Sequence, residues 1–182
     1  MPIELDGDTI VIGRRALSTL RHKLAEDIGE HAAVRLQEAG HAGGVELYEF
    51  FVRWLTATTG ITDPGTVDAL TLGPTLSDFF GALGWGTVTV EQVGKNGLAV
   101  DATDWAEADP GEGAPFPSCF FSAGLLGEFV GRLANTTIAV MEVECRSAGH
   151  ERCRFLLGTP ETLDVVYQAI SEGRDYATAL SD

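Results

Sequence analysis

Lysine is nearly absent from this sequence: Lys23 and Lys95 are the only two in 182 residues. Lysine and arginine together number 12 against 27 aspartates and glutamates, so the formal net charge is −15 at pH 7. Nucleic acids and anionic membrane surfaces are bound through basic faces, because their phosphate groups must be neutralised. We therefore expect no nucleic-acid partner.

The sequence also lacks long apolar runs. Its first residues, MPIELDGDTIVIGRR, do not place a basic segment before an apolar one, as a signal peptide does. No uninterrupted apolar stretch approaches the roughly 18 residues that cross a bilayer. These absences predict a cytoplasmic protein without a membrane span. The length predicts a single domain over residues 1–182.

Cysteine is scarce too, with Cys119, Cys145 and Cys153 as the only three. An odd number cannot pair completely within one chain, and thiols stay reduced in the cytoplasm. A disulfide framework is thus disfavoured. The three thiols are either small buried side chains or ligands of a metal.

Hydrophobic spacing indicates a mixture of helices and strands. Helices are predicted over 14–29, 30–40, 44–60, 75–83 and 119–135, with a last one opened by Thr159-Pro160. Strands are predicted over 85–93, 98–105, 137–145 and 152–158, with turns at 41–44, 62–66, 73–75 and 96–97 and a loop over 106–118. This order predicts an α+β fold: an antiparallel sheet covered by helices on one side, with a cysteine-bearing β-hairpin followed by a C-terminal helix.

Three glycines at helical spacing, Gly124, Gly127 and Gly131, share one face of the helix predicted over 119–135. Each interior glycine costs about 1 kcal/mol relative to alanine. The stripe therefore indicates either close approach of another element, which we favour, or room for a ligand against bare backbone.

The stretch MEVECRSAGHERCRF, residues 141–155, places two cysteines on either side of a predicted turn. Strand pairing would bring Cys145 and Cys153 together, and the helix that begins at Cys119 would add a third thiol. Glu142 joins them only if the strand ends or carries a bulge, because simple alternation points Glu142 and Cys145 to opposite faces. Three thiolates and a carboxylate match a closed, structural zinc site. From the residues alone, a plain hairpin with three buried thiols fits equally well.

The segment GLLGEFVGRLANTTIAVMEVECRSAGHERCRF, residues 124–155, resembles the 4-vinyl-reductase-type (hydrocarbon-binding) domain family. It is also similar to the sensor domains of bacterial activators that respond to phenol and other aromatics. The shared pattern is a Cys at a helix start, a Glu before a second Cys, a Gly-His pair, and a third Cys followed by a basic and an aromatic residue. The resemblance covers roughly residues 14–172. The zinc ligands that it implies are Cys119, Glu142, Cys145 and Cys153, with Glu144 as the alternative carboxylate.

The family resemblance also implies a homodimer that encloses an apolar pocket. Aromatic residues concentrate between residues 75 and 125, and most of them are expected in the core. The candidate pocket residues are Phe120, Phe121, Trp105, Phe116, Phe80 and Trp85. The phenol sensors hold the ligand hydroxyl with a histidine and a tryptophan, whereas this chain has no histidine between residues 42 and 149. We therefore expect a more apolar ligand than phenol.

Three classes of function remain open. The favoured one is a small-molecule-binding sensory or regulatory domain with a structural zinc and an apolar or aromatic, hydrocarbon-like ligand. The second is a tetrapyrrole (4-vinyl) reductase or its accessory factor. Because GALGWG, residues 81–86, lacks the strand-and-helix setting of a dinucleotide-binding loop, an enzyme is the less favoured interpretation. The third is a dimeric assembly protein with the vesicle-tethering-like fold.

Overall fold

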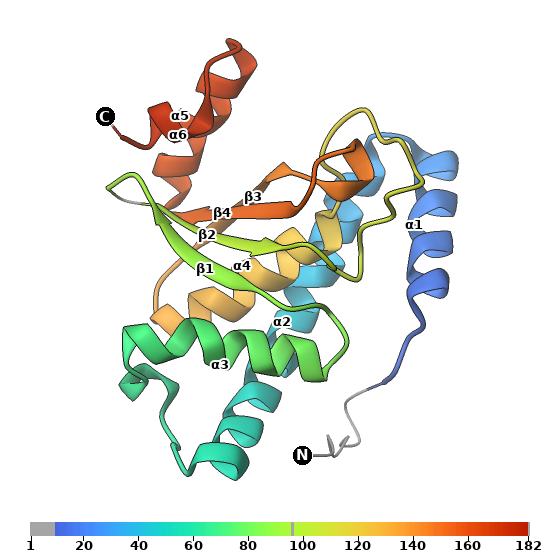
Figure 1. Ribbon diagram of the computed structural model, residues 1–182. Helices are drawn as coiled ribbons and strands as arrows, with labels where there is room; N and C mark the ends of the chain where they lie inside the picture. Colours follow the sequence, from blue (N-terminus) through green and yellow to red (C-terminus); the bar gives the residue numbers. More distant parts are fainter. Residues whose placement is uncertain (1–9, 96, 182) are drawn as a thin grey trace.

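The computed structural model describes residues 10–95 and 97–181, apart from the side chain of Ala69. Its helices are α1 Arg14–Ile28, α2 His31–Thr59, α3 Ala69–Ala82, α4 Phe120–Ala134, α5 Pro160–Ser171 and α6 Tyr176–Ala179. Short 3₁₀ turns lie at η1 Pro64–Thr66 and η2 Arg146–Ala148. Its strands are β1 Thr89–Val93, β2 Gly97–Ala102, β3 Ala139–Glu144 and β4 Cys153–Gly158 (Figure 1).

The four strands form one antiparallel sheet in the order β1-β2-β4-β3, which confirms the predicted α+β fold. Helices α2, α3 and α4 pack against one face around a core rich in phenylalanine. The other face is also covered: Leu163 and Val166 of α5 pack with Val93, Ala99 and Leu156 of the sheet. Helices therefore lie on both faces rather than on one side, because the chain turns back over the sheet after β4 (Figure 1).

The turn predicted at 41–44 is wrong, because α2 continues unbroken through these residues. Gly40 and Gly44 lie on the side of α2 that meets α4. A Cβ added to Gly40 would lie 1.9 Å from the carbonyl oxygen of Phe121, and one added to Gly44 would lie 2.6 Å from the Cβ of Glu128. These glycines thus let two helix backbones approach each other and do not end a helix.

The glycine stripe of α4 has the packing role that the sequence favoured. A Cβ on Gly124 would lie 2.0 Å from the carbonyl oxygen of Gln37 in α2, and one on Gly131 would lie 3.1 Å from that of Thr136. Gly127 is the exception, since its nearest neighbours would stand at ordinary contact distances of 3.6 Å or more. Close helix approach therefore explains Gly124 most directly.

The turn predicted at 73–75 is also wrong, since it lies inside α3. The helix begins at Ala69 and not at Thr75, because the side chain of Asp68 accepts a hydrogen bond from the backbone N–H of Leu70 at 2.7 Å and caps the helix there. The Thr75 hydroxyl instead donates to the carbonyl of Thr71, one turn earlier.

Other boundaries follow the sequence closely. Gly60 ends α2 with a φ of 79°, and the side chain of Thr159 caps α5 through the N–H of Thr162. The turn at 62–66 and the loop over 106–118 are both present. Asn96 lies outside the described residues, so the type I′ turn stays a prediction.

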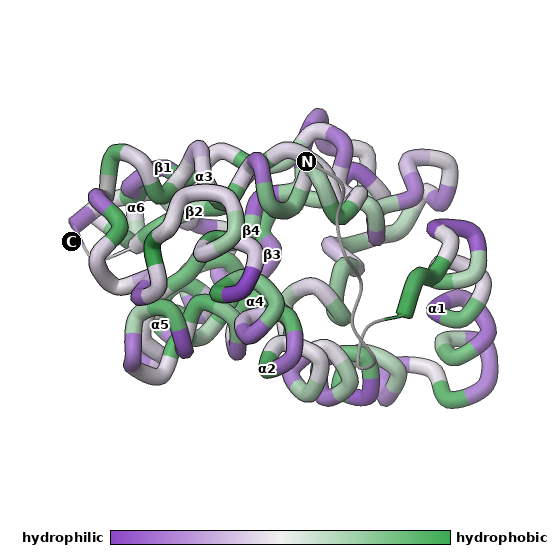
Figure 2. Tube along the Cα trace, turned by 90° about the horizontal axis from the view of Figure 1, so that it is seen from below, coloured by the Kyte–Doolittle hydropathy of each residue, from purple (hydrophilic) through white to green (hydrophobic). Residues whose placement is uncertain are grey.

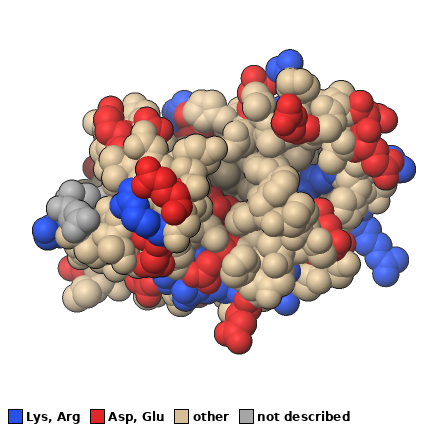
Figure 3. Space-filling view, turned by 90° about the horizontal axis from the view of Figure 1, so that it is seen from above, with Lys and Arg blue, Asp and Glu red and all other residues tan. Residues whose placement is uncertain are grey.

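Helix α1 lies at one end of the molecule, and Figure 2 shows hydrophilic residues along its outer turns. Figure 3 shows acidic side chains spread widely over the face seen from above, as the net charge of −15 leads one to expect. None of the described helices is long and apolar enough to cross a membrane.

Candidate metal centre

The four residues expected to hold a metal lie together, each placed by a different feature of the fold. Cys119 is the N-cap residue of α4, Glu142 lies on β3, Cys145 precedes η2, and Cys153 begins β4. Their ligand atoms all lie within 4.8 Å of one another. One helix start and both strands of the hairpin therefore converge on one point, where a metal ion can be held.

A bulge in β3 brings Glu142 into the cluster. The pairing of β3 with β4 shifts between Glu142 and Glu144: Glu142 lies opposite Phe155, and Glu144 lies opposite Arg154. Such an irregularity changes which side of the strand the following residues face. The irregularity that the sequence required between Glu142 and Cys145 is thus present.

The two candidate carboxylates have different partners. Glu144 accepts hydrogen bonds from Arg152, at 2.9 Å from Nε, and from the hydroxyl of Tyr176. Glu142 accepts the backbone N–H of Cys119 at 2.8 Å through Oε2, while its buried Oε1 has no hydrogen-bond partner. The oxygen that is free to bind an ion therefore belongs to Glu142.

The sulfur atoms are spaced as ligands and not as a disulfide. All three cysteines are free and at most 1% exposed. The Sγ atoms of Cys119 and Cys145 lie 3.7 Å apart. A disulfide would need about 2.05 Å, whereas two thiolates in a tetrahedral zinc site with bonds of about 2.3 Å lie about 3.8 Å apart. The donor set and its spacing fit zinc.

Without a cation, the cluster does not favour full ionisation. Burial, together with the neighbouring Cys145, raises the pKa of Glu142 to about 8. Hydrogen bonding to Cys145 and Cys153, with burial, raises the pKa of Cys119, and the same contacts lower the pKa of Cys145. One thiolate surrounded by protonated neighbours is thus the favoured state. A divalent cation would offset the repulsion and let all four groups ionise.

His150 contacts the backbone of the site. Its Nδ1 lies 3.2 Å from the nitrogen and 3.1 Å from the oxygen of Cys145, and its side chain is exposed. The imidazole therefore braces the turn after β3 and makes no described contact with a thiol.

The sequence reasoning missed a buried ion pair beside the cluster. Arg21 of α1 is 4% exposed, and its Nε lies 3.1 Å from Oε1 of Glu107, which is fully buried. Glu107 also accepts the backbone N–H groups of Phe121 and Ser122, at 3.2 and 2.7 Å, and so caps the start of α4. Burial raises the pKa of Glu107, while Arg21 and the donors of Ser122 and Phe121 act against it. The pair fixes the helix end next to Cys119.

Replacing Glu107 with glutamine should destabilise the protein by about 3–5 kcal/mol, because it leaves the charge of Arg21 buried without its partner. Urea unfolding measures this loss. Asp109→Asn is the control in the same loop, at a partly buried residue, and is expected to cost less than about 1 kcal/mol. Equal effects of the two changes would show that the ion pair does not hold the loop.

The aromatic pocket candidates fall into two groups. Phe80 and Trp105 belong to the core, at 2% and 0% exposed, and the indole N–H of Trp105 donates to Ser122 Oγ at 2.7 Å. Trp85 stacks on Phe121 with ring centroids 6.1 Å apart. The remaining two, Phe116 and Phe120, line a cavity of about 490 Å³ between α1, α2 and the loop over 106–118.

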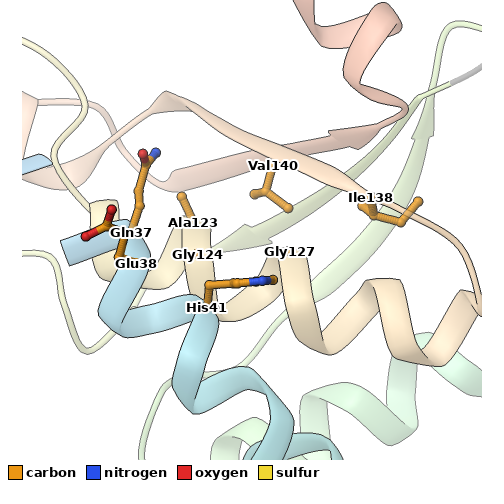
Figure 4. Close-up of a pocket in the computed structure, with 8 residues that line it drawn as sticks. All are labelled: Gln37, Glu38, His41, Ala123, Gly124, Gly127, Ile138 and Val140. Carbon is orange, nitrogen blue, oxygen red and sulfur yellow. The ribbon is translucent and has the colours of Figure 1, made fainter. Parts of the chain in front are cut away.

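A second hollow, of about 320 Å³, lies where α2, α4 and β3 meet. Figure 4 shows His41 of α2 reaching toward Gly127 of α4, with Val140 and Ile138 on the opposite wall. His41 also approaches Glu128, with Nδ1 3.3 Å from Oε2. The hollow is a wide groove between helix and strand, and its floor includes bare glycine backbone.

A model of the 4-vinyl-reductase domain family matches residues 107–159 of the chain. This matched segment contains all four clustered residues and both strands of the hairpin. The match confirms the family resemblance found from residues 124–155. No curated protein matches the chain.

Several solved structures resemble the whole chain. The phenol-responsive sensory domain of the transcription activator PoxR, with phenol, is 25% identical, has a TM-score of 0.63, and is matched over 96% of this chain and 84% of that one. A vinyl-4-reductase family protein from Methanocaldococcus jannaschii is 15% identical with a TM-score of 0.53, over 82% and 83% of the two chains. A trafficking protein particle complex subunit 3 from Naegleria fowleri, covalently bound to palmitic acid, is 10% identical with a TM-score of 0.62, over 80% and 91%. The last two show a shared fold alone.

Proposed function

We propose that this protein is a small-molecule-binding sensory or regulatory domain whose segment 107–159 is held together by a structural zinc ion. The observation that carries the proposal is the buried cluster of Cys119, Glu142, Cys145 and Cys153, in which a carboxylate oxygen and three thiols face one another without other partners that fix them. The likeness to the phenol-responsive domain of PoxR supports the sensory role.

In this proposal the zinc is structural. Four protein ligands complete a tetrahedral shell and leave no position for water or a substrate, so the ion would supply folding energy and not catalysis. Cys119 would anchor α4, while Cys145 and Cys153 would anchor the two strands. The protein would act in the cytoplasm as a homodimer, where reducing conditions preserve thiolates.

The ligand in this proposal is small and largely apolar or aromatic. The cavity lined by Phe116 and Phe120 has the size and mostly apolar walls that are usual for such ligands. Because the loop over 106–118 forms one wall of the cavity and also leads into Cys119, a ligand there would lie against the segment that carries the first zinc ligand.

Native mass spectrometry of protein purified without added metal tests the zinc site. We expect one zinc ion per chain. Glu142→Gln should weaken zinc retention during dialysis against a chelator, because the free carboxylate oxygen is lost. Glu144→Gln is the matched control on the same strand and should keep the ion, since Glu144 faces Arg152 and Tyr176. Protein without metal and with three freely titrating thiols would contradict the proposal.

A further inference from the structure

The cavity of about 490 Å³ beside α1 carries chemical information about its ligand. Its walls come from α1, the start of α2, the loop over 106–118 and the first turn of α4. Most of the lining is apolar or small, including Ala25, Ala32, Leu36, Pro115, Phe116 and Phe120. The selectivity of such a site depends on its few polar groups.

One of these groups, Arg21, already has its full set of partners. Its Nη1 donates to the carbonyl of Glu107 at 2.7 Å, its Nη2 donates to the carbonyl of Ser118 at 2.9 Å, and the Glu107 carboxylate pairs with its Nε. The charges of Arg21 and Glu107 therefore balance each other. An anionic ligand would have to compete for a guanidinium that is already bound on several sides.

The group left over is the carboxylate of Glu112. Its Oε1 lies 3.1 Å from Nε2 of His22. Its Oε2 is buried, has no hydrogen-bond partner, and lies 3.7 Å from Nη2 of Arg21, which is beyond hydrogen-bond distance. A buried acceptor without a donor is unfavourable, and the natural complement is a ligand that brings an N–H. Glu30, also in the lining, adds a second acidic group at the exposed side of the cavity.

Two aromatic rings favour the same ligand. The centroids of Phe116 and Phe120 lie 6.4 Å apart, with their planes tilted by 50°. Rings arranged in this way offer their faces to an apolar group, and ring faces also attract cations. A carboxylate with a free oxygen beside two phenyl rings is a suitable environment for a substituted ammonium group.

We propose that this cavity binds a protonated amine attached to an aromatic or branched apolar group. The ammonium donates to Oε2 of Glu112, and the apolar part packs against Phe116, Phe120 and the alanines of α1 and α2. This assignment rests on the proposed small-molecule function and names the ligand class. Neutral alcohols and phenols of the same shape are the competing class.

A bound amine would also lie close to the metal hairpin. The backbone N–H of Ala114, in the cavity wall, donates to the carbonyl of Ser147 at 2.8 Å, and the N–H of Asp109 donates to its hydroxyl at 2.9 Å. Ser147 lies in η2, between Cys145 and Cys153. These two contacts connect the cavity wall directly to the turn that carries two of the proposed zinc ligands.

Calorimetric titration of the whole protein, as purified, with phenethylamine and with phenethyl alcohol at pH 7 tests the ligand class. We expect the amine to bind saturably and about tenfold more tightly than the alcohol, a difference of about 1.4 kcal/mol. Glu112→Gln should weaken amine binding about tenfold and change alcohol binding little. Phe116→Leu, at a side chain that is 58% exposed, should weaken amine binding without unfolding the protein.

Glu26→Gln is the matched control, because Glu26 is exposed on α1 and pairs with Lys23 outside the cavity. If the alcohol binds as tightly as the amine, or if Glu112→Gln leaves amine binding unchanged, the ligand class is wrong and the small-molecule function stands. If neither probe binds saturably, the cavity assignment fails. The zinc content of the same sample then shows separately whether the metal part of the proposed function also fails.

Discussion

Replacing Cys153 with serine is expected to remove the bound zinc and to lower the melting temperature by roughly 10 °C. An ion present at about a thousand times its dissociation constant stabilises the folded state by about 4.1 kcal/mol. For a domain of this size each kcal/mol corresponds to about 2–4 °C. Cys153 is fully buried at the start of β4, so serine finds no water there to replace the metal bond. Cys145→Ser should behave in the same way.

Thermal unfolding with and without a strong chelator measures this effect. The chelator should lower the melting temperature of the unaltered protein to near that of Cys153→Ser, and it should leave the variant unchanged. This comparison separates loss of the metal from the local cost of a buried hydroxyl. A Cys153→Ser variant that stays fully folded, with the original melting temperature and no response to chelator, would exclude the metal centre.

Replacing Gly40 with alanine should destabilise the protein by about 3 kcal/mol, at the upper end of the usual cost of overpacking. The new methyl would lie 1.9 Å from the carbonyl oxygen of Phe121, so the backbones of α2 and α4 must move apart. Gly43→Ala is the matched control in the same helix. A Cβ there would meet only Leu125 Cδ1 at 3.6 Å, an ordinary contact.

Urea unfolding of the two variants distinguishes packing from helix propensity. Since alanine favours a helix by up to about 1 kcal/mol over glycine, Gly43→Ala should be neutral or stabilising. Opposite signs for the two changes would confirm that α2 and α4 meet backbone to backbone at Gly40. If both variants gain stability, the close approach is not a constraint on the fold.

The sequence predicted elements best where the determining signal is local. Thr159-Pro160 at the start of α5 and Gly60 at the end of α2 lie next to the boundaries that they set. The glycines at 40–44 misled the prediction because glycine is found both where a helix ends and where another backbone comes close. The residue that decides between these roles, Phe121, lies about 80 positions later in the chain, beyond the reach of any local pattern.

The candidate site shows the same division. Strand alternation predicted that Glu142 needs an irregularity to join Cys145, and the bulge between Glu142 and Glu144 supplies it. Nothing in the alternation separated Glu142 from Glu144; the contacts of Glu144 with Arg152 and Tyr176 do so. These are tertiary contacts that the pattern does not contain.

Arg21 was missed for a related reason. An arginine in an amphipathic helix is usually a surface residue, and the one local signal is its position four residues after Leu17, on the apolar side of α1. Its partner, Glu107, is 86 residues away in a loop without regular structure. A buried charge of this kind is found only when both residues are seen together.

The ligand cluster has a topological consequence as well as an energetic one. With zinc bound, Cys119 and Cys153 become the ends of a cross-link that closes a loop of about 34 residues, and such a closure reduces the freedom of the unfolded chain by about 4 kcal/mol at room temperature. Helix α4, β3 and the turn after it all lie inside this closed loop, whereas α1 lies outside it. The restraint therefore acts on the sheet side of the domain, and α1 can shift against the cavity without breaking the loop.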